Sequence, residues 1–248
     1  MALTRAVLPG DPPLEVAVAR RAQARRLSLR VSHPEGRVTL SIPLRLDDSV
    51  ALAFLHEKEP WLRKTLSRLP RRVQAGIGAQ LPLRGQALIL KTGTSRGIHA
   101  DTDAGALFLP ADPTGRRSGP RLAAWLKMQA QADLAAACAR HAAALGRSHG
   151  AIALRDTRSR WGSCSSAGRL MFSWRLVMAP PEVLDYVAAH EVAHLAEMNH
   201  SRAFWAHVEQ LCPQYQRLRD WLRRNGHGLH RYDFTPPEPG DPSGANGT

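Results

Sequence analysis

The sequence HEVAHLAEMNH, at residues 190–200, contains three histidines and two glutamates within eleven residues. His190 and His194 are four residues apart, and on an α-helix two side chains at this spacing project from the same face, one turn apart. Two imidazoles in this position can bind one zinc ion. The stretch therefore predicts a helix that carries a metal site, and it makes that helix the centre of the expected fold.

The preceding residues predict where this helix begins and how it is buried. Pro180 and Pro181 favour a helix start, because the N–H that proline lacks has no helical partner in the first turn. The residues that follow supply an apolar stripe of Val183, Leu184, Val187 and Ala188. Such a stripe would bury one face of the helix and leave another face to the two histidines.

Glu191 stands next to the first histidine. In the pattern His-Glu-x-x-His, which is typical of zincins, this glutamate does not need to bind the metal. It can take a proton from a metal-bound water, whose pKa the ion lowers to about 7. Glu191 is therefore the candidate catalytic residue, as a general base.

A catalytic zinc usually has three protein ligands, so a third is needed. Glu197 would lie near the face of the two histidines on a continued helix, and a carboxylate is a possible ligand. His200 would point elsewhere on the same helix. A break near Asn199, a residue that tolerates the left-handed conformation found at helix ends, would turn His200 back, and Ser201 could cap the next helix. We favour His200, with Glu197 as the alternative.

The first half of the chain alternates apolar and polar residues at the period of a strand. Residues 16–43 contain three such runs, and the turn signal HPEGR at residues 33–37 predicts a hairpin. A helical period follows Asp47, which is a suitable N-cap, and Pro60 predicts a kink or restart in that helix. Short strands are expected again over residues 81–112.

The second half predicts a long helix at residues 121–145, and then a hairpin within residues 151–180, whose strands the turn SSAG separates. With the helices around His190 and after it, these elements predict an α+β fold. We expect a zincin-like region with a long helix, a small antiparallel sheet, the metal-site helix and a C-terminal helix. A β-rich N-terminal region would precede it.

Composition suggests boundaries between these regions. Both ends of the chain are rich in Pro, Gly and small polar residues. Such segments bury too little apolar surface to offset the entropy of ordering. We expect a flexible N-terminus (1–15), a β-rich region with a helical insertion (16–112), the zincin-like region (113–234) and a disordered tail (235–248). Residues 16–234 would form one continuous unit.

The chain is strongly basic, because 34 Lys and Arg face 21 Asp and Glu, which gives a formal net charge of +13. This charge can attract an anionic partner, such as nucleic acid, a nucleotide or an acidic peptide. An arginine-rich proteome would produce the same excess. Charge alone therefore does not select a substrate.

Cysteine spacing and hydropathy indicate the cellular compartment in which the protein is expected. Cys138, Cys164 and Cys212 form no CxxC pair, which indicates neither a disulfide framework nor a thiolate zinc site. The first residues lack the apolar core of a signal peptide, and no run approaches the roughly 18 apolar residues of a membrane span. We expect a soluble cytoplasmic protein without a membrane partner.

Several stretches, in order along the chain, resemble the YgjP-like metallopeptidase family. They are RRLSLRV (25–31), GRVTLSIP (36–43), FLHEKEPWLRKTL (54–66), RSRWGSCSS (158–166) and WRLVMAPPEVLDYVAAHEVAHLAEMNHSRAFW (174–205). The resemblance covers about residues 16–234, and the family is related to the SprT-like and minigluzincin proteases. It implies zinc (Zn²⁺) at His190, His194 and His200, with Glu191 as the general base.

These observations favour a zinc metallohydrolase, and among such enzymes a metallopeptidase that acts on a peptide or protein. One alternative is a nucleoside triphosphate pyrophosphohydrolase, a label that some members of the family carry, in which a divalent ion and arginines would neutralise phosphates. Another is a basic protein that binds nucleic acid or a partner and has a structural metal site.

The stretch RSRWGSC contributes candidate substrate-binding residues. We expect it to form a strand beside the metal site, where a sheet edge could take an extended peptide by backbone pairing. Arg158 and Arg160 would share one face of that strand and could bind a substrate carboxylate or phosphate. Pairing with nearby acidic residues is the structural alternative.

Overall fold

The computed structural model describes residues 3–32, 36–69 and 71–237, and within these residues the chain has the expected α+β fold. It divides into two compact units, Met1–Arg71 and Arg72–Thr248. The strands between residues 73 and 110 thus belong to the second unit, although the sequence pattern grouped them with residues 16–71.

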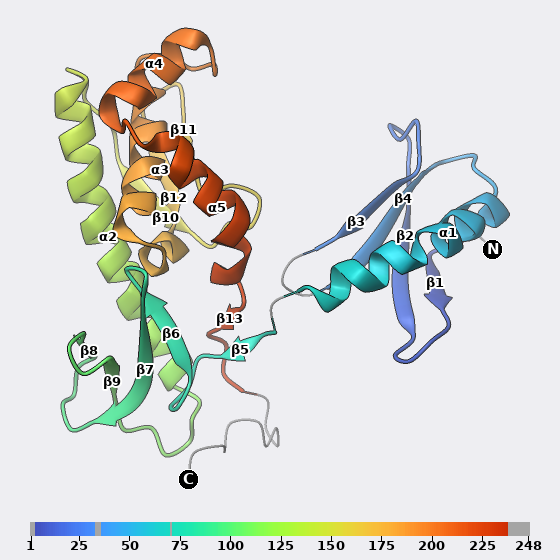
Figure 1. Cartoon of the computed structure of the whole chain (residues 1–248), viewed down its shortest axis with the longest axis horizontal. Helices are drawn as coiled ribbons and strands as arrows, with labels where there is room; N and C mark the ends of the chain where they lie inside the picture. Colours follow the sequence, from blue (N-terminus) through green and yellow to red (C-terminus); the bar gives the residue numbers. More distant parts are fainter. Residues whose placement is uncertain (1–2, 33–35, 70, 238–248) are drawn as a thin grey trace. The chain divides into compact units, whose positions relative to one another are not determined.

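The first unit is a four-stranded sheet with one helix along one face (Figure 1). The strand order is β1-β2-β4-β3, in which β2 and β4 are parallel and the other pairs are antiparallel. The elements are β1 (Arg5–Leu8), β2 (Leu14–Arg21), β3 (Ser28–Val31), β4 (Val38–Pro43) and α1 (Asp48–Ser67).

The alternation of apolar and polar residues along the strands explains the core of this unit. Every second residue of β4 and of the middle of β2 is buried, including Val16, Leu40 and Ile42, and these pack with Leu55 and Leu62 of α1. Helix α1 begins as expected, since the side chain of its N-cap accepts a hydrogen bond of 2.8 Å from the Ser49 amide. It runs through Pro60 as one helix, so the restart considered there does not occur.

The N-terminal segment is not flexible throughout, because Arg5–Leu8 forms β1 and pairs with β2. Ala6 and Leu8 are buried, and two inward-facing apolar residues are enough to fix this edge strand despite the surrounding prolines. Strands β3 and β4 pair as the predicted hairpin, but residues 33–35 of its turn lie outside the described residues. Residues 238–248 of the expected tail lie outside them as well.

The second unit has two larger sheets around a long helix. Its strands are β5 (Val73–Gln74), β6 (Gln80–Leu83), β7 (Gln86–Gly93), β8 (His99–Asp101), β9 (Ala106–Pro110), β10 (Ile152–Arg155), β11 (Gly162–Cys164), β12 (Leu170–Ser173) and β13 (Tyr232–Asp233). Its helices are α2 (Ser118–Ala144), a 3-10 helix (Trp174–Met178), α3 (Pro181–Ala193), α4 (Arg202–Leu211) and α5 (Tyr215–Leu229).

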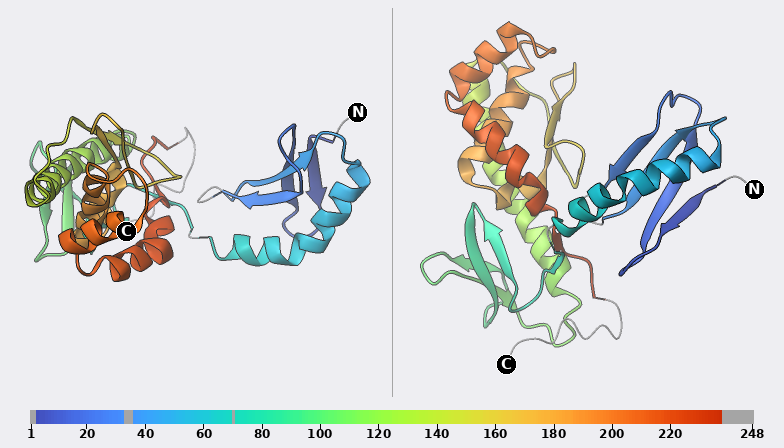
Figure 2. Two further views of the ribbon diagram at one scale, coloured as in Figure 1. Left: turned by 90° about the horizontal axis from the view of Figure 1, so that it is seen from above. Right: turned by 45° about the vertical axis from the view of Figure 1, so that its right-hand side comes forward.

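Helix α2 confirms the long helix that the sequence predicts, and it lies beside α3 (Figure 1). The sheet β6-β7-β9-β8 lies at one end of α2, as Figure 2 also shows. Although α2 is long, none of the helices in the described residues has the apolar length that a membrane crossing requires.

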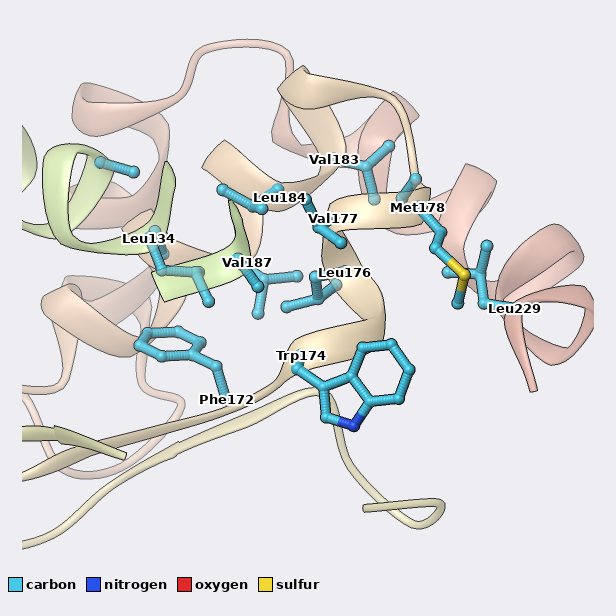
Figure 3. Packing of buried hydrophobic residues seen from close by; sticks show 14 of the residues in the cluster. Leu134, Phe172, Trp174, Leu176, Val177, Met178, Val183, Leu184, Val187 and Leu229 are labelled. Carbon is cyan, nitrogen blue, oxygen red and sulfur yellow. The ribbon is translucent and has the colours of Figure 1, made fainter. Parts of the chain in front are cut away.

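The core that supports α3 comes from the adjacent segments. Phe172 of β12, Leu176 of the 3-10 helix and Leu134 of α2 pack around Val183 and Val187 of α3 (Figure 3). All five side chains are at most 4% exposed. The predicted apolar stripe is therefore buried, but α3 is buried on most of its other sides as well, because Tyr186, Ala189 and Val192 are also covered.

The small sheet β10-β12-β11 differs in one respect from the expected antiparallel sheet. Strands β11 and β12 form the antiparallel hairpin, but β10 pairs with β12 in parallel. Strand β11 is at the edge of this sheet and contacts α3. The order places β11 beside the stretch that contains His190.

Candidate metal centre

Helix α3 places the first two histidines at its C-terminal end. The helix starts at Pro181, as expected, and His190 lies in its last turn, while His194 is the C-cap residue. The centroids of the two imidazole rings are 5.3 Å apart. The predicted pair of histidines on one helix face is therefore present.

The chain then reverses, and this reversal brings in His200. Helix α3 ends at Ala193, earlier than the break expected near Asn199. The Nε2 atoms of His200 and His190 are 3.2 Å apart. One ligand atom from each of His190, His194 and His200 lies within 4.8 Å of the other two, so these three side chains could hold one metal ion.

His194 is oriented by the main chain of Glu197. Its Nδ1 atom lies 2.9 Å from the carbonyl oxygen of Glu197, and because a carbonyl can only accept, Nδ1 carries the proton. The lone pair of the neutral ring is then on Nε2. Glu197 thus contributes its carbonyl group here, and His200 rather than its carboxylate joins the histidine group.

His190 is held as a neutral imidazole. Burial is the main cause that lowers its pKa to about 3, and the neighbouring His194 and His200 contribute to the same shift. A neutral imidazole is the form that binds metals. Its Nδ1 atom is buried and has no hydrogen-bond partner within the described part of the chain.

The distance between His190 and His200 fits a tetrahedral ion. Two nitrogens bound to one zinc at about 2.0–2.1 Å lie about 3.3 Å apart, close to the 3.2 Å between His190 and His200. Three imidazoles suit a divalent transition metal such as zinc, copper, iron or nickel, and they are a poor set for calcium or magnesium. The residues present therefore fit the zinc that the sequence motif predicts.

Helix α4 packs against the three histidines. Its N-cap is Ser201, as expected, whose Oγ accepts a hydrogen bond of 3.2 Å from the Phe204 amide. The ring of Phe204 lies 4.4–4.9 Å from all three imidazoles. An apolar wall of this kind limits solvent access and holds the ligands in place.

Glu191 is buried beside this group, with 6% of its surface exposed. Burial raises the pKa of its carboxyl to about 7, although the charge of Arg160 acts in the opposite direction. A Cβ atom at Gly162 would lie only 2.6 Å from Cγ and Oε1 of Glu191. The glycine of β11 therefore leaves the space that the carboxylate occupies. The sequence analysis did not identify Gly162, although a glycine within a strand pattern can indicate such a close approach.

The comparisons with known proteins agree with this geometry. The family model described as the YgjP-like metallopeptidase domain matches residues 25–225. The chain belongs to the YgjP-like metallopeptidase family. Membership implies a hydrolase with a divalent metal, and the three histidines are where this YgjP-like chain could hold it.

Other comparisons add little for this YgjP-like protein. The crystal structure of the metallopeptidase zymogen abylysin from Pyrococcus abyssi matches with 20% identity and a TM-score of 0.35, over 37% of this chain and 93% of that chain. A likeness at this level carries no functional argument. No curated protein matches.

The candidate substrate-binding arginines lie in the loop before β11 and not on the strand, which begins at Gly162. The hydroxyl of Thr157 donates a hydrogen bond of 2.8 Å to the carbonyl of Arg160 and closes this loop. Arg158 and Arg160 both line a pocket together with side chains of α5. Sequence reasoning missed the α5 residues, although Arg219, Arg223 and His227 recur every four residues, a spacing that indicates one helix face.

Proposed function

We propose that this YgjP-like protein is a zinc-dependent peptidase in which His190, His194 and His200 hold the metal and Glu191 is the general base. One observation carries the proposal: three imidazole ligand atoms within 4.8 Å of one another, next to a buried carboxylate. A catalytic zinc site combines three protein ligands with an open position in the same way.

When bound, zinc would polarise the scissile carbonyl and lower the pKa of a water molecule. Glu191 would accept a proton from the attacking water and deliver it to the leaving amine. Its position supports this role, because Gly162 leaves room for the carboxylate beside the first ligand. The apolar ring of Phe204 limits the entry of other water.

The edge of β11 would position the peptide. Among the described strands, β11 pairs only with β12, so its other edge offers main-chain N–H and C=O groups. An extended peptide can pair with such an edge as an additional strand. Since β11 contacts α3, a peptide there would lie near Glu191.

Replacement of the proposed base tests the mechanism. Glu191→Gln should keep its zinc, because the ligands are untouched, and lose about a hundredfold to ten-thousandfold in kcat on a casein-derived or quenched-fluorescence peptide pool. Glu197→Gln is the matched control and should hydrolyse peptides like the wild type. If Glu191→Gln cleaved peptides as fast as the wild type, the proposal would be wrong.

A second candidate, hydrolysis of nucleoside triphosphates, is favoured by the four arginines of the pocket beside the metal centre. Arginines and a divalent ion could neutralise the phosphates. Pyrophosphate release that a chelator abolishes, in the absence of peptide cleavage, would favour this candidate over the peptidase.

A further inference from the structure

A basic pocket adjoins the candidate metal centre on the side of α5. It has a volume of about 310 Å³. We call it the basic pocket, and it is lined by Arg158, Ser159, Arg160, Trp161, Tyr186, Arg219, Leu222, Arg223, His227 and His230. Four arginines around a space of this size concentrate positive potential in one place.

The charged residues that line the pocket are all basic. Neither Asp nor Glu is among its lining residues in the described part of the chain. Arg223 contacts Asp220 at 3.1 Å, but both side chains are largely exposed, so this pair is weak. The guanidinium of Arg219 lies over the ring of Trp205, 4.9 Å from its centroid, which fixes its direction without neutralising it.

The two walls of the pocket are packed against each other. A Cβ atom at Gly226 of α5 would lie 2.9 Å from the ring of Trp161, and that ring also contacts His230 at a centroid distance of 5.1 Å. The loop that carries Arg158 and Arg160 is thus held against α5. The backbone segments that carry the arginines are thus fixed relative to each other before a ligand binds, which lowers the entropy that binding costs.

The pocket lies next to the metal centre. The ring of Tyr186, which lines the pocket, lies 6.1 Å from that of His190. Trp205, beneath Arg219, lies 5.7 Å from the ring of His190. The pocket and the three histidines are therefore separated by the thickness of one aromatic side chain.

We infer that the basic pocket binds a carboxylate of the peptide substrate, so that the protein prefers peptides with an acidic side chain or a free C-terminus near the scissile bond. This inference rests on the proposed peptidase function. Arginine forks pair with carboxylates through two parallel hydrogen bonds. The rings of Trp161 and Tyr186 supply apolar surface for the attached carbon chain, and the pocket is at the small end of the range for ligand sites.

The test measures binding, so it does not depend on turnover. Calorimetry with Glu191→Gln protein would compare ATP with three acetylated peptides: Ala-Ala-Glu-Ala-Ala amide, its Gln counterpart, and an all-alanine peptide with a free C-terminus. The pocket variant combines Arg219→Gln with Arg223→Gln. The control variant combines Arg217→Gln with Arg224→Gln, which removes the same charge from the same helix, and Arg224, like Arg223, contacts Asp220.

We expect the Glu peptide or the free-acid peptide to bind at least about tenfold more tightly than the Gln amide, since hydrogen bonds to charged groups are worth more than neutral ones. The peptide that binds more tightly identifies the source of the carboxylate. The pocket variant should lose this preference and the control variant should keep it.

Three outcomes would overturn the inference. They are equal binding of all three peptides, an equal loss of preference in both double variants, and tighter binding of ATP than of either acid by the pocket. If the preference is found but the wild type hydrolyses none of the peptides, the proposed peptidase function fails and the pocket assignment stands.

Discussion

The Nε2 atoms of His190 and His200 lie 3.2 Å apart, although the two residues are ten positions apart in the sequence. The turn after α3 makes this possible, because the helix ends at Ala193 and the carbonyl of Glu197 then accepts a hydrogen bond from His194. The same turn therefore brings in one histidine and orients another.

Gly162→Ala should reduce turnover without removing the metal. The added methyl group would lie 2.6 Å from Cγ and Oε1 of Glu191, so the carboxylate must move. A displacement of about 1 Å can cost about a hundredfold in rate. Peptide hydrolysis and zinc content would be measured together. Gly76→Ala, where an added Cβ meets nothing within 4 Å, should behave like the wild type, and unchanged kcat in Gly162→Ala would refute this prediction.

Arg175→Lys should destabilise the second unit. The buried guanidinium binds both carboxylate oxygens of Asp156, at 2.6 and 3.1 Å, and the carbonyls of Leu229 and Tyr232, at 3.0 and 3.1 Å. Lysine cannot reproduce this fork, and the loss of a hydrogen bond to a buried carbonyl costs about 1–3 kcal/mol. Urea unfolding would measure the loss in the free energy of unfolding. Arg224→Lys, at an exposed pair, is the control and should stay within about 0.5 kcal/mol of the wild type.

Asp112→Asn should lower stability in a pH-dependent way. Burial opposes the ionised form of Asp112, but hydrogen bonds from Thr114, Arg117 and Ser118 outweigh it and lower the pKa to about 2. A carboxylate with a lowered pKa stabilises the fold above its unfolded pKa of about 3.9, and this contribution is lost as the pH falls toward 2.

The difference between Asp112→Asn and the wild type should therefore be about 1 kcal/mol at pH 7, which is typical of a capping side chain, and should shrink between about pH 4 and pH 2. Chemical unfolding at several pH values would measure it. A difference that stayed constant over this range would show that the charge of Asp112 is not involved.

The sequence predicted those parts of the site that depend on local spacing. His190 and His194 follow from one helical turn, and the capping of α4 by Ser201 follows from the side chain alone. The position of His200 depended on a helix end that was expected near Asn199 and occurs at Ala193, where the turn that follows contains the hydrogen bond from His194 to the carbonyl of Glu197.

Contacts between distant segments could not be predicted in this way. Gly162 meets Glu191 only because β11 pairs with β12 and packs on α3. The basic pocket joins Arg160 of a loop to Arg219 of α5, 59 positions later in the chain. Such contacts depend on how elements pack, for which sequence periodicity has no signal.

Metal analysis of the purified wild type, His200→Ala and Glu197→Ala is the most direct test of the central proposal, a zinc site made by three histidines. We predict about one zinc per chain in the wild type and in Glu197→Ala, which keeps the main-chain carbonyl that orients His194, and strongly reduced zinc in His200→Ala. Full zinc in His200→Ala together with its loss from Glu197→Ala would contradict the three-histidine site.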